Sequence, residues 1–231
     1  CDYVKAWKRS GKTISISFDE WGVWSMPDRE VAAAVDESPW QVAPHLSEQI
    51  YSMEDALLFA SMMMNFLKYA DRVKIACQSL LTNISAAVMT EEKGGVWVQP
   101  IYYPFMHMAN YGRGKVLQGA AELPAYDCTL MKQVPYVDYV AVHNEERKEV
   151  VLFAVNRAQD EVTGLTVELQ GFQAVEIIGH TTMCTEDRKT TNLADHDAVK
   201  PKPYDGSRLE ENILISQLPP LSWNMVRIGI L

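Results

Sequence analysis

Two kinds of hydrophobic pattern divide this chain. In the first part, strand-like and helix-like patterns follow each other. They predict a strand at 13–20, a helix from Ser52 to about Tyr69, a strand at 73–77 and a helix at 99–110. Strand and helix in alternation are typical of a parallel β/α sheet or barrel. We therefore expect residues 1–114 to form part of such a fold.

From about residue 115 the pattern changes to short alternating runs without helical segments between them. Polar or turn-forming stretches, such as 144–148 and 202–206, separate the runs. Seven strands are predicted, at 126–133, 136–143, 149–156, 165–170, 174–180, 212–218 and 223–230. Such a series is typical of an antiparallel β-sandwich, here jelly-roll-like, which we expect for residues 115–231.

The first long helix has a clear predicted start. Ser52-Met53-Glu54-Asp55 resembles a capping box, in which the Ser hydroxyl and the acidic side chain satisfy free N–H groups. The apolar stretch 56–67 is too short to cross a bilayer and is bounded by charged residues. We therefore interpret it as a buried core helix and expect no membrane partner.

Composition narrows the classes of partner. The formal net charge is −9 and the basic residues are scattered, which argues against binding to nucleic acid. The four cysteines, at 1, 77, 128 and 184, form no C-x-x-C pair, and the five histidines show no metal-ligand spacing. We expect a neutral partner, no metal, no cofactor and a reducing compartment.

One carboxylate stands out as candidate chemistry. Ile14, Ile16 and Phe18 alternate with smaller polar residues, so the even positions share one face of the predicted strand, and Glu20 would end that face. Glu20 is flanked by Trp21 and Trp24. A carboxylate between aromatic residues at a strand end suggests half of a sugar-cleaving site. The alternative is a surface carboxylate beside two core tryptophans.

The start of the chain carries a further expectation. Residues 2–10 have the pattern of the last turns of an amphipathic helix, with a basic end followed by Gly11. We expect an upstream part of the protein to precede this helix.

Several segments resemble one enzyme family in order along the chain. Near the start they are Ser17-Phe18-Asp19-Glu20-Trp21, then 51–57 and 70–77; later come 103–106, 141–146, 153–157 and 219–224. Together they are similar to the C-terminal half of α-L-arabinofuranosidases of glycoside hydrolase family 51. The resemblance implies the last strands and helices of a (β/α)8 barrel followed by the sandwich.

The resemblance also implies residue roles in retaining hydrolysis, which needs two carboxylic acids. Glu20 corresponds to the nucleophile at the end of the seventh barrel strand, and Trp24 to a tryptophan that lines the arabinose pocket. Asp19 is expected to be structural and Trp21 to pack in the core. The family's acid/base glutamate lies on an earlier strand, which this sequence does not include.

The second barrel strand departs from the family pattern. A sugar-contacting glutamine of the family matches Leu80, whereas here a glutamine stands two residues earlier, at Gln78. Two residues along a strand keep the same face. Either Gln78 contacts the sugar from a deeper level, or the local loop differs.

The implied activity is removal of terminal arabinofuranosyl groups from arabinose-containing oligosaccharides of arabinoxylan or arabinan, in the cytoplasm. The isolated chain is expected to be inactive and to associate with its upstream half or to form oligomers. One alternative is a non-catalytic carbohydrate-binding or assembly fragment. Another is a related retaining barrel enzyme that acts on a different sugar.

Overall fold

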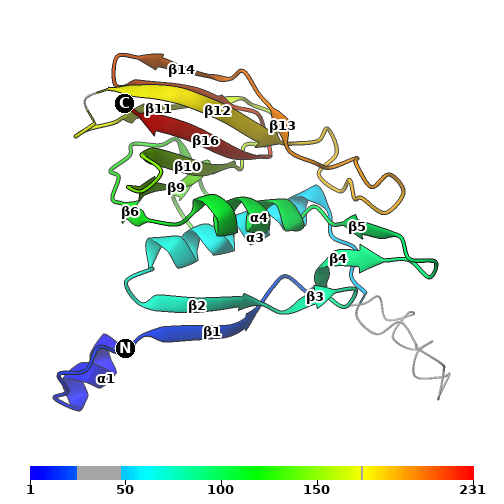
Figure 1. Ribbon diagram of the computed structural model, residues 1–231, viewed down its shortest axis with the longest axis horizontal. Helices are drawn as coiled ribbons and strands as arrows, with labels where there is room; N and C mark the ends of the chain where they lie inside the picture. The colour runs from blue at the N-terminus through cyan, green and yellow to red at the C-terminus, as the bar shows by residue number, and fades with distance from the viewer. Residues whose placement is uncertain (25–47, 173) are drawn as a thin grey trace.

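The computed structural model describes residues 1–24, 48–172 and 174–231. It arranges them in stacked layers (Figure 1). The helices are α1 (Asp2–Trp7), α3 (Met53–Lys68) and α4 (Tyr102–Tyr111). The first strands are β1 (Ile16–Trp21), β2 (Val73–Gln78), β3 (Leu80–Thr82), β4 (Ala86–Thr90), β5 (Val96–Val98), β6 (Lys115–Leu117), β7 (Ala125–Tyr126) and β8 (Val134–Pro135). The later ones are β9 (Val137–Asn144), β10 (Glu149–Asn156), β11 (Thr163–Glu168), β12 (Val175–Met183), β13 (Lys202–Pro203), β14 (Ser207–Glu210), β15 (Ile213–Leu218) and β16 (Ser222–Ile230).

The first layers form a β/α unit. Strands β1 and β2 pair in parallel, and α3 lies between them in the chain. The predicted capping box starts this helix: the Asp55 side chain accepts a 2.8 Å hydrogen bond from the Ser52 backbone N–H, and the Ser52 hydroxyl accepts one from the Asp55 N–H. The expectation of a β/α unit with a capped helix is confirmed. None of the described helices is long and apolar enough to cross a membrane.

The second half forms two antiparallel sheets. One has six strands in the order β13-β12-β16-β10-β9-β6, and the other has three in the order β11-β15-β14. A hydrophobic cluster that includes Leu152, Leu165, Leu214 and Ile228 fills the space between them. These facing sheets confirm the predicted β-sandwich.

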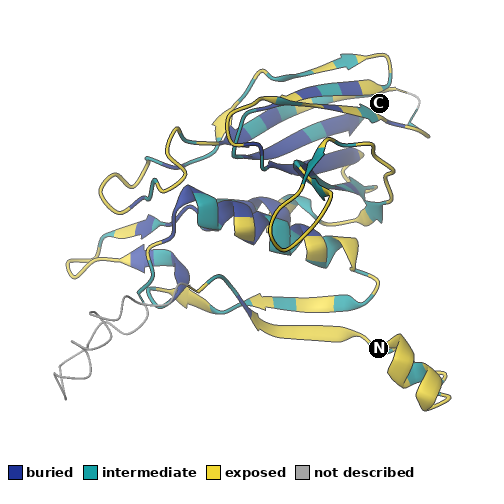
Figure 2. Ribbon diagram, turned by 180° about the vertical axis from the view of Figure 1, so that it is seen from behind, coloured by how far each residue is buried: buried dark blue, intermediate teal, exposed yellow. Residues whose placement is uncertain are grey.

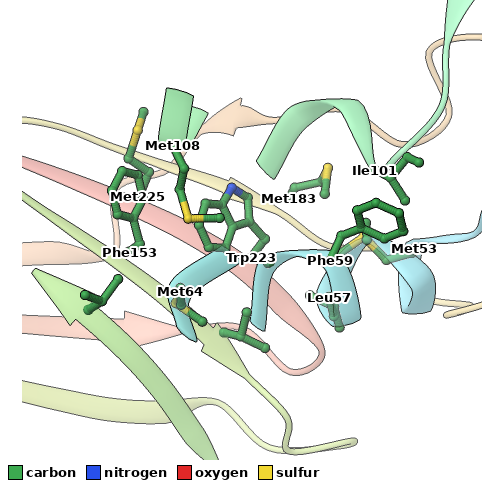
Figure 3. Close-up of a cluster of buried hydrophobic side chains, with 14 of the residues drawn as sticks. Met53, Leu57, Phe59, Met64, Ile101, Met108, Phe153, Met183, Trp223 and Met225 are labelled. Atoms are coloured by element: carbon green, nitrogen blue, oxygen red, sulfur yellow. The ribbon is translucent and has the colours of Figure 1, made fainter. Parts of the chain in front are cut away.

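A larger hydrophobic cluster joins the two halves of the chain. Phe59 and Met64 of α3, Met108 of α4 and Phe153 and Trp223 of the six-stranded sheet are all buried in it (Figure 3). The rings of Phe153 and Trp223 stack with centroids 5.6 Å apart. The six-stranded sheet therefore lies between the helices and the smaller sheet.

The position of the six-stranded sheet between two layers explains why all eight residues of its strand β10 are buried. Val151 and Phe153 belong to the cluster facing the helices, whereas Val150 and Leu152 belong to the cluster between the sheets. A strand covered on both faces needs apolar residues at successive positions, as in parallel sheets.

Two predicted elements have different bounds. The strand predicted at 126–133 is wrong beyond Tyr126, because the Asp127 side chain accepts hydrogen bonds from the Gln133 N–H and the Lys132 ammonium and closes a turn. The helix predicted from residue 99 begins at Tyr102, and the buried Gln99 side chain bonds backbone groups instead. The sequence does not predict the short strands β3 to β6, β8, β13 and β14.

Candidate active site

The candidate nucleophile lies where β1 ends. Phe18 pairs with Ala76 and Trp21 with Gln78, so β1 spans three positions where β2 spans two. Such an extra residue is a β-bulge, which re-aims side chains and is frequent next to active sites. Glu20 lies inside this bulge and is exposed.

The bulge changes which face of the β1–β2 sheet the side chains after Phe18 occupy. Phe18 packs against Phe66 of α3 with ring centroids 5.3 Å apart, so it faces the helix. After the bulge Trp21 takes that side, with its centroid 5.2 Å from the same Phe66 ring. The expectation that Glu20 continues the row of Phe18 is therefore wrong. The side chain of Glu20 reaches Ser79 beyond the end of β2.

The contact between Glu20 and Ser79 is the main polar interaction at this strand end. The Ser79 hydroxyl donates a 2.6 Å hydrogen bond to Oε1 of Glu20, and the Ser79 N–H donates a 3.0 Å bond to the Trp21 carbonyl. The backbone bond fixes Ser79 next to the bulge, so its hydroxyl meets the carboxylate without a long side chain. The Ser79 hydroxyl therefore fixes the orientation of the Glu20 carboxylate at the strand end.

Trp24 is held at the same end of the sheet. Its side chain is 50% exposed, and its six-membered ring lies over Gly22, where a Cβ would stand 3.2 Å from the ring. The Tyr51 hydroxyl donates a 2.9 Å hydrogen bond to the carbonyl of Val23, and the Tyr51 N–H donates to the side chain of Gln99. Tyr51 therefore anchors the segment that presents the exposed face of Trp24.

Burial raises the pKa of Tyr51 to about 12, with the nearby Asp55 charge acting in the same direction and a hydrogen bond to Ser85 opposing it. The phenol therefore stays protonated over the working range of ordinary hydrolases. It can keep donating to Val23 at every such pH.

Gln78 lies on a different side from Glu20. Its strand neighbour Ala76 packs against the core of α3, and residues two apart share a face. The register also pairs Gln78 with the buried Trp21. Its Nε2 is buried without a hydrogen-bond partner among the described residues. Contact between Gln78 and a sugar stays a prediction, whereas Leu80, the family's glutamine position, is 46% exposed at the start of β3.

Sequence reasoning missed Ser79 and Tyr51 as parts of this site. A usable signal existed for Ser79, because parallel strands end at the same edge and residue 79 follows the second strand directly. No comparable signal existed for Tyr51, whose contact with Val23 joins residues 28 positions apart. Within the described ranges, no three or more His, Cys, Asp or Glu side chains are grouped to hold a metal ion.

Comparison with known proteins relates the chain to one enzyme family. Residues 19–222 match the family described as "Alpha-L-arabinofuranosidase C-terminal domain". The chain is 44% identical over 230 residues to an intracellular exo-α-(1→5)-L-arabinofuranosidase of Acetivibrio thermocellus, with 99% of the chain and 46% of that protein covered. It is 45% identical over 231 residues to the enzyme of the same description from Halalkalibacterium halodurans, covering 99% of the chain and 45% of that protein.

A solved structure gives the same result. The family 51 α-L-arabinofuranosidase of Bifidobacterium longum superposes with a TM-score of 0.86 at 32% identity, covering 98% of this chain and 44% of that one. The chain thus spans less than half the length of these relatives. It belongs to the family 51 α-L-arabinofuranosidases, of which it comprises the C-terminal part.

Proposed function

We propose that the protein containing this chain is a retaining exo-α-L-arabinofuranosidase and that Glu20 is its nucleophile. The observation that carries the proposal is the position of Glu20 in a β-bulge at the carboxyl end of a parallel strand, with a donor hydroxyl on its carboxylate. Active sites of β/α barrels lie at that end of the strands.

The proposed reaction has two steps. A carboxylate oxygen of Glu20 attacks the anomeric carbon of the terminal arabinofuranose while a second carboxylic acid, about 5 Å away, protonates the departing glycosidic oxygen. A glycosyl ester on Glu20 results. The second group, now a carboxylate, then removes a proton from water, which attacks the anomeric carbon and releases arabinose and free Glu20.

The other site residues have supporting roles in this proposal. The exposed ring of Trp24 offers an apolar wall to one face of the sugar. A sugar contact of Gln78 would require its side chain to reach round from the face that packs on α3. Ser79 orients the carboxylate of the nucleophile through its 2.6 Å hydrogen bond. The acid/base residue is supplied by a strand outside residues 1–231.

The relatives at 44% and 45% identity are named for exo-α-(1→5) activity and as intracellular. We therefore propose α-(1→5)-linked arabino-oligosaccharides as substrates and the cytoplasm as the location. Terminal arabinofuranosyl groups of arabinoxylan oligosaccharides are the next substrates to assay.

The β1–β2 pair needs a neighbour in the complete protein. Ile16, Phe18 and Ile75 are 38%, 42% and 53% exposed on this small sheet, and β1 is largely exposed (Figure 2). Unpaired strand edges and exposed apolar side chains favour association. We propose that further barrel strands of the same protein cover this sheet, and that the isolated chain is inactive and prone to association, including oligomer formation.

The test of the proposal is Glu20→Ala in the complete enzyme. Removing a covalent nucleophile is expected to lower turnover of an aryl α-L-arabinofuranoside on the order of 10⁴-fold, with partial rescue by azide, which replaces the carboxylate as nucleophile. Glu168→Ala, which removes an exposed carboxylate on β11, is the matched control and should keep activity. Retained activity in Glu20→Ala excludes Glu20 as nucleophile. A panel of other aryl glycosides separates this proposal from a related enzyme for another sugar.

A further inference from the structure

A cleft is present on the sandwich side of the molecule. It has a volume of about 650 Å³. The β7–β8 hairpin and the following Tyr136 form one wall, and the segment 157–164 after β10 forms the other. Small-molecule sites commonly fall in this size range. Glu20 is not among its lining residues, so this cleft is separate from the candidate active site.

The cleft and Glu20 lie at opposite ends of α3. The helix starts after the carboxyl end of β1 and ends at Lys68, whose ammonium is paired with Asp138. Asp138 also accepts a 2.9 Å bond from Arg157, a lining residue of the cleft. A helix of 16 residues is roughly 24 Å long. The cleft is therefore remote from the nucleophile.

The wall after β10 is held in place by buried hydrogen bonds. The fully buried Asn156 accepts bonds of 3.0 Å from the Ala158 N–H and 3.1 Å from the Thr163 hydroxyl. Its Nδ2 donates to the carbonyls of Leu218 and Pro219, at 3.0 and 2.9 Å. One side chain thus fixes both ends of the wall to the sandwich, so the cleft is a preformed feature.

The hairpin side contributes two aromatic rings. Tyr126 and Tyr136 lie with ring centroids 4.8 Å apart and planes inclined at 42°, and both are half-buried. The guanidinium of Arg157 is bound to the Pro135 carbonyl at 3.1 Å as well as to Asp138. Tyrosine rings offer an apolar surface together with a polar hydroxyl, which suits ligands that have both characters.

The charges in the cleft select the class of ligand. Asp138 is shared between Arg157 and Lys68, while Asp160 and Glu161, on the same wall as Arg157, are exposed carboxylates. The two cations and three carboxylates together leave this side of the cleft with an excess of negative charge. Carboxylates accept hydrogen bonds and repel anions, so a phosphorylated or carboxylated ligand is disfavoured. A neutral ligand with many hydroxyl donors and apolar ring faces fits both the acceptors and the tyrosines.

We propose that this cleft is a second, non-catalytic site that binds a neutral arabinose-containing chain. The choice of arabinose rests on the proposed function, whereas the carbohydrate class rests on the tyrosines and the carboxylates of the cleft. The site holds a polymer or long oligosaccharide by sugar units that lie away from the chain ends. It thereby keeps chain ends near the enzyme without contributing to bond cleavage.

The test uses the complete enzyme with Glu20→Ala, which prevents hydrolysis, in affinity electrophoresis through gels containing debranched arabinan. Tyr126→Ala combined with Tyr136→Ala is expected to weaken retardation roughly fivefold to tenfold, since two aromatic contacts are lost. Tyr69→Ala removes a tyrosine that is 62% exposed outside the cleft and is the matched control. Tyr126→Phe with Tyr136→Phe keeps the rings and should retain most of the binding.

The same tyrosine variants with Glu20 intact are assayed on an aryl α-L-arabinofuranoside. This substrate is too short to reach the cleft, so kcat/KM should be unchanged. If the double alanine variant and its parent are retarded equally, the proposed second site is overturned. The same equal retardation is expected if the cleft binds a basic peptide instead of arabinan. Absence of aryl hydrolysis in the unsubstituted enzyme overturns the proposed activity, and the gel assay still reports on the cleft.

Discussion

The hydroxyl of Ser79 donates a 2.6 Å hydrogen bond to Oε1 of Glu20. The two residues are 59 positions apart in the chain, and parallel pairing of β1 with β2 brings them together. The bulge in β1 turns Glu20 out of the helix-facing row, and the backbone bond from Ser79 to Trp21 fixes the donor beside it. The carboxylate is therefore oriented by the end of the neighbouring strand.

Replacing Ser79 by Ala should lower kcat/KM for an aryl arabinofuranoside roughly tenfold. The variant loses a hydrogen bond to a charged group, typically worth about 1.5 kcal/mol when partly exposed. Steady-state kinetics on the complete enzyme measure the effect. Ser17→Ala is the control, because the Ser17 hydroxyl bonds Asp19 on the same strand. Equal kcat/KM values for Ser79→Ala and the unsubstituted enzyme would exclude this orienting role.

Tyr51→Phe should loosen the segment before Trp24. The variant loses the hydrogen bond to the Val23 carbonyl but keeps the ring that packs against Phe59. We expect KM to rise severalfold and the free energy of unfolding to fall by about 1 kcal/mol. Kinetics and urea unfolding measure the two effects. Tyr69→Phe, which alters an exposed tyrosine, should change neither.

The raised pKa of Tyr51 makes the stability of the folded state depend on pH. Because the folded pKa of about 12 exceeds the usual 10, the folded state retains the proton more strongly than the unfolded state. The stability from this group is therefore complete below pH 10 and is lost as the pH rises toward 12. If the stability of Tyr51→Phe declines between pH 10 and pH 12 as steeply as that of the parent, this assignment is contradicted.

The sequence predicts the β/α unit and most sandwich strands because their signals are local. The spacing of Ser52 and Asp55 indicates a helix start, and alternation indicates β9, β11 and β15. The predicted strand at 126–133 ends early because one side chain, Asp127, closes a turn that composition does not reveal.

In the candidate site, too, the sequence predicts features with local signals and does not predict those that depend on strand pairing. Glu20 and Trp24 are recognisable from residues next to them in the sequence. The bulge depends on the register between two strands, and strict alternation applied to β1 cannot detect an inserted residue. The same limit applies to Gln78, whose face follows from pairing with Trp21 and from packing of Ala76 on α3. The pairing of β1 with β2 joins residues more than 50 positions apart, so no local pattern contains it.

Asn192 should be a strong determinant of stability. This buried side chain donates to the carbonyls of Val98 and Val199, both at 3.0 Å, and accepts a 2.8 Å bond from the Val199 N–H. Asn192→Ala leaves these buried groups without partners, so we expect a loss of about 3 kcal/mol in the free energy of unfolding. Urea unfolding measures it.

The matched control is Asn110→Ala, which removes an exposed asparagine with one bond to the Met106 carbonyl. It should cost less than about 1 kcal/mol. Similar losses in both variants would show that the network around Asn192 contributes little beyond an ordinary surface hydrogen bond.

His107 should make the protein less stable in mild acid. Burial lowers the pKa of His107 to about 4, and its Nδ1 accepts a 3.1 Å hydrogen bond from the indole N–H of Trp223. The unfolded state, with a pKa near 6.5, binds a proton that the folded state rejects. The stability associated with neutral His107 is complete above pH 6.5 and is lost as the pH falls toward 4, by on the order of 3 kcal/mol.

Urea unfolding at pH 7 and pH 5 measures this dependence in the complete protein. His107→Asn keeps a side-chain acceptor but has no titrating group, so the difference in stability between the two pH values should shrink. Burial also lowers the pKa of His180, although its bond to Asn224 opposes the shift, so some acid sensitivity should remain in the variant. If the variant loses as much stability as the parent between pH 7 and pH 5, the acid sensitivity arises from groups other than His107.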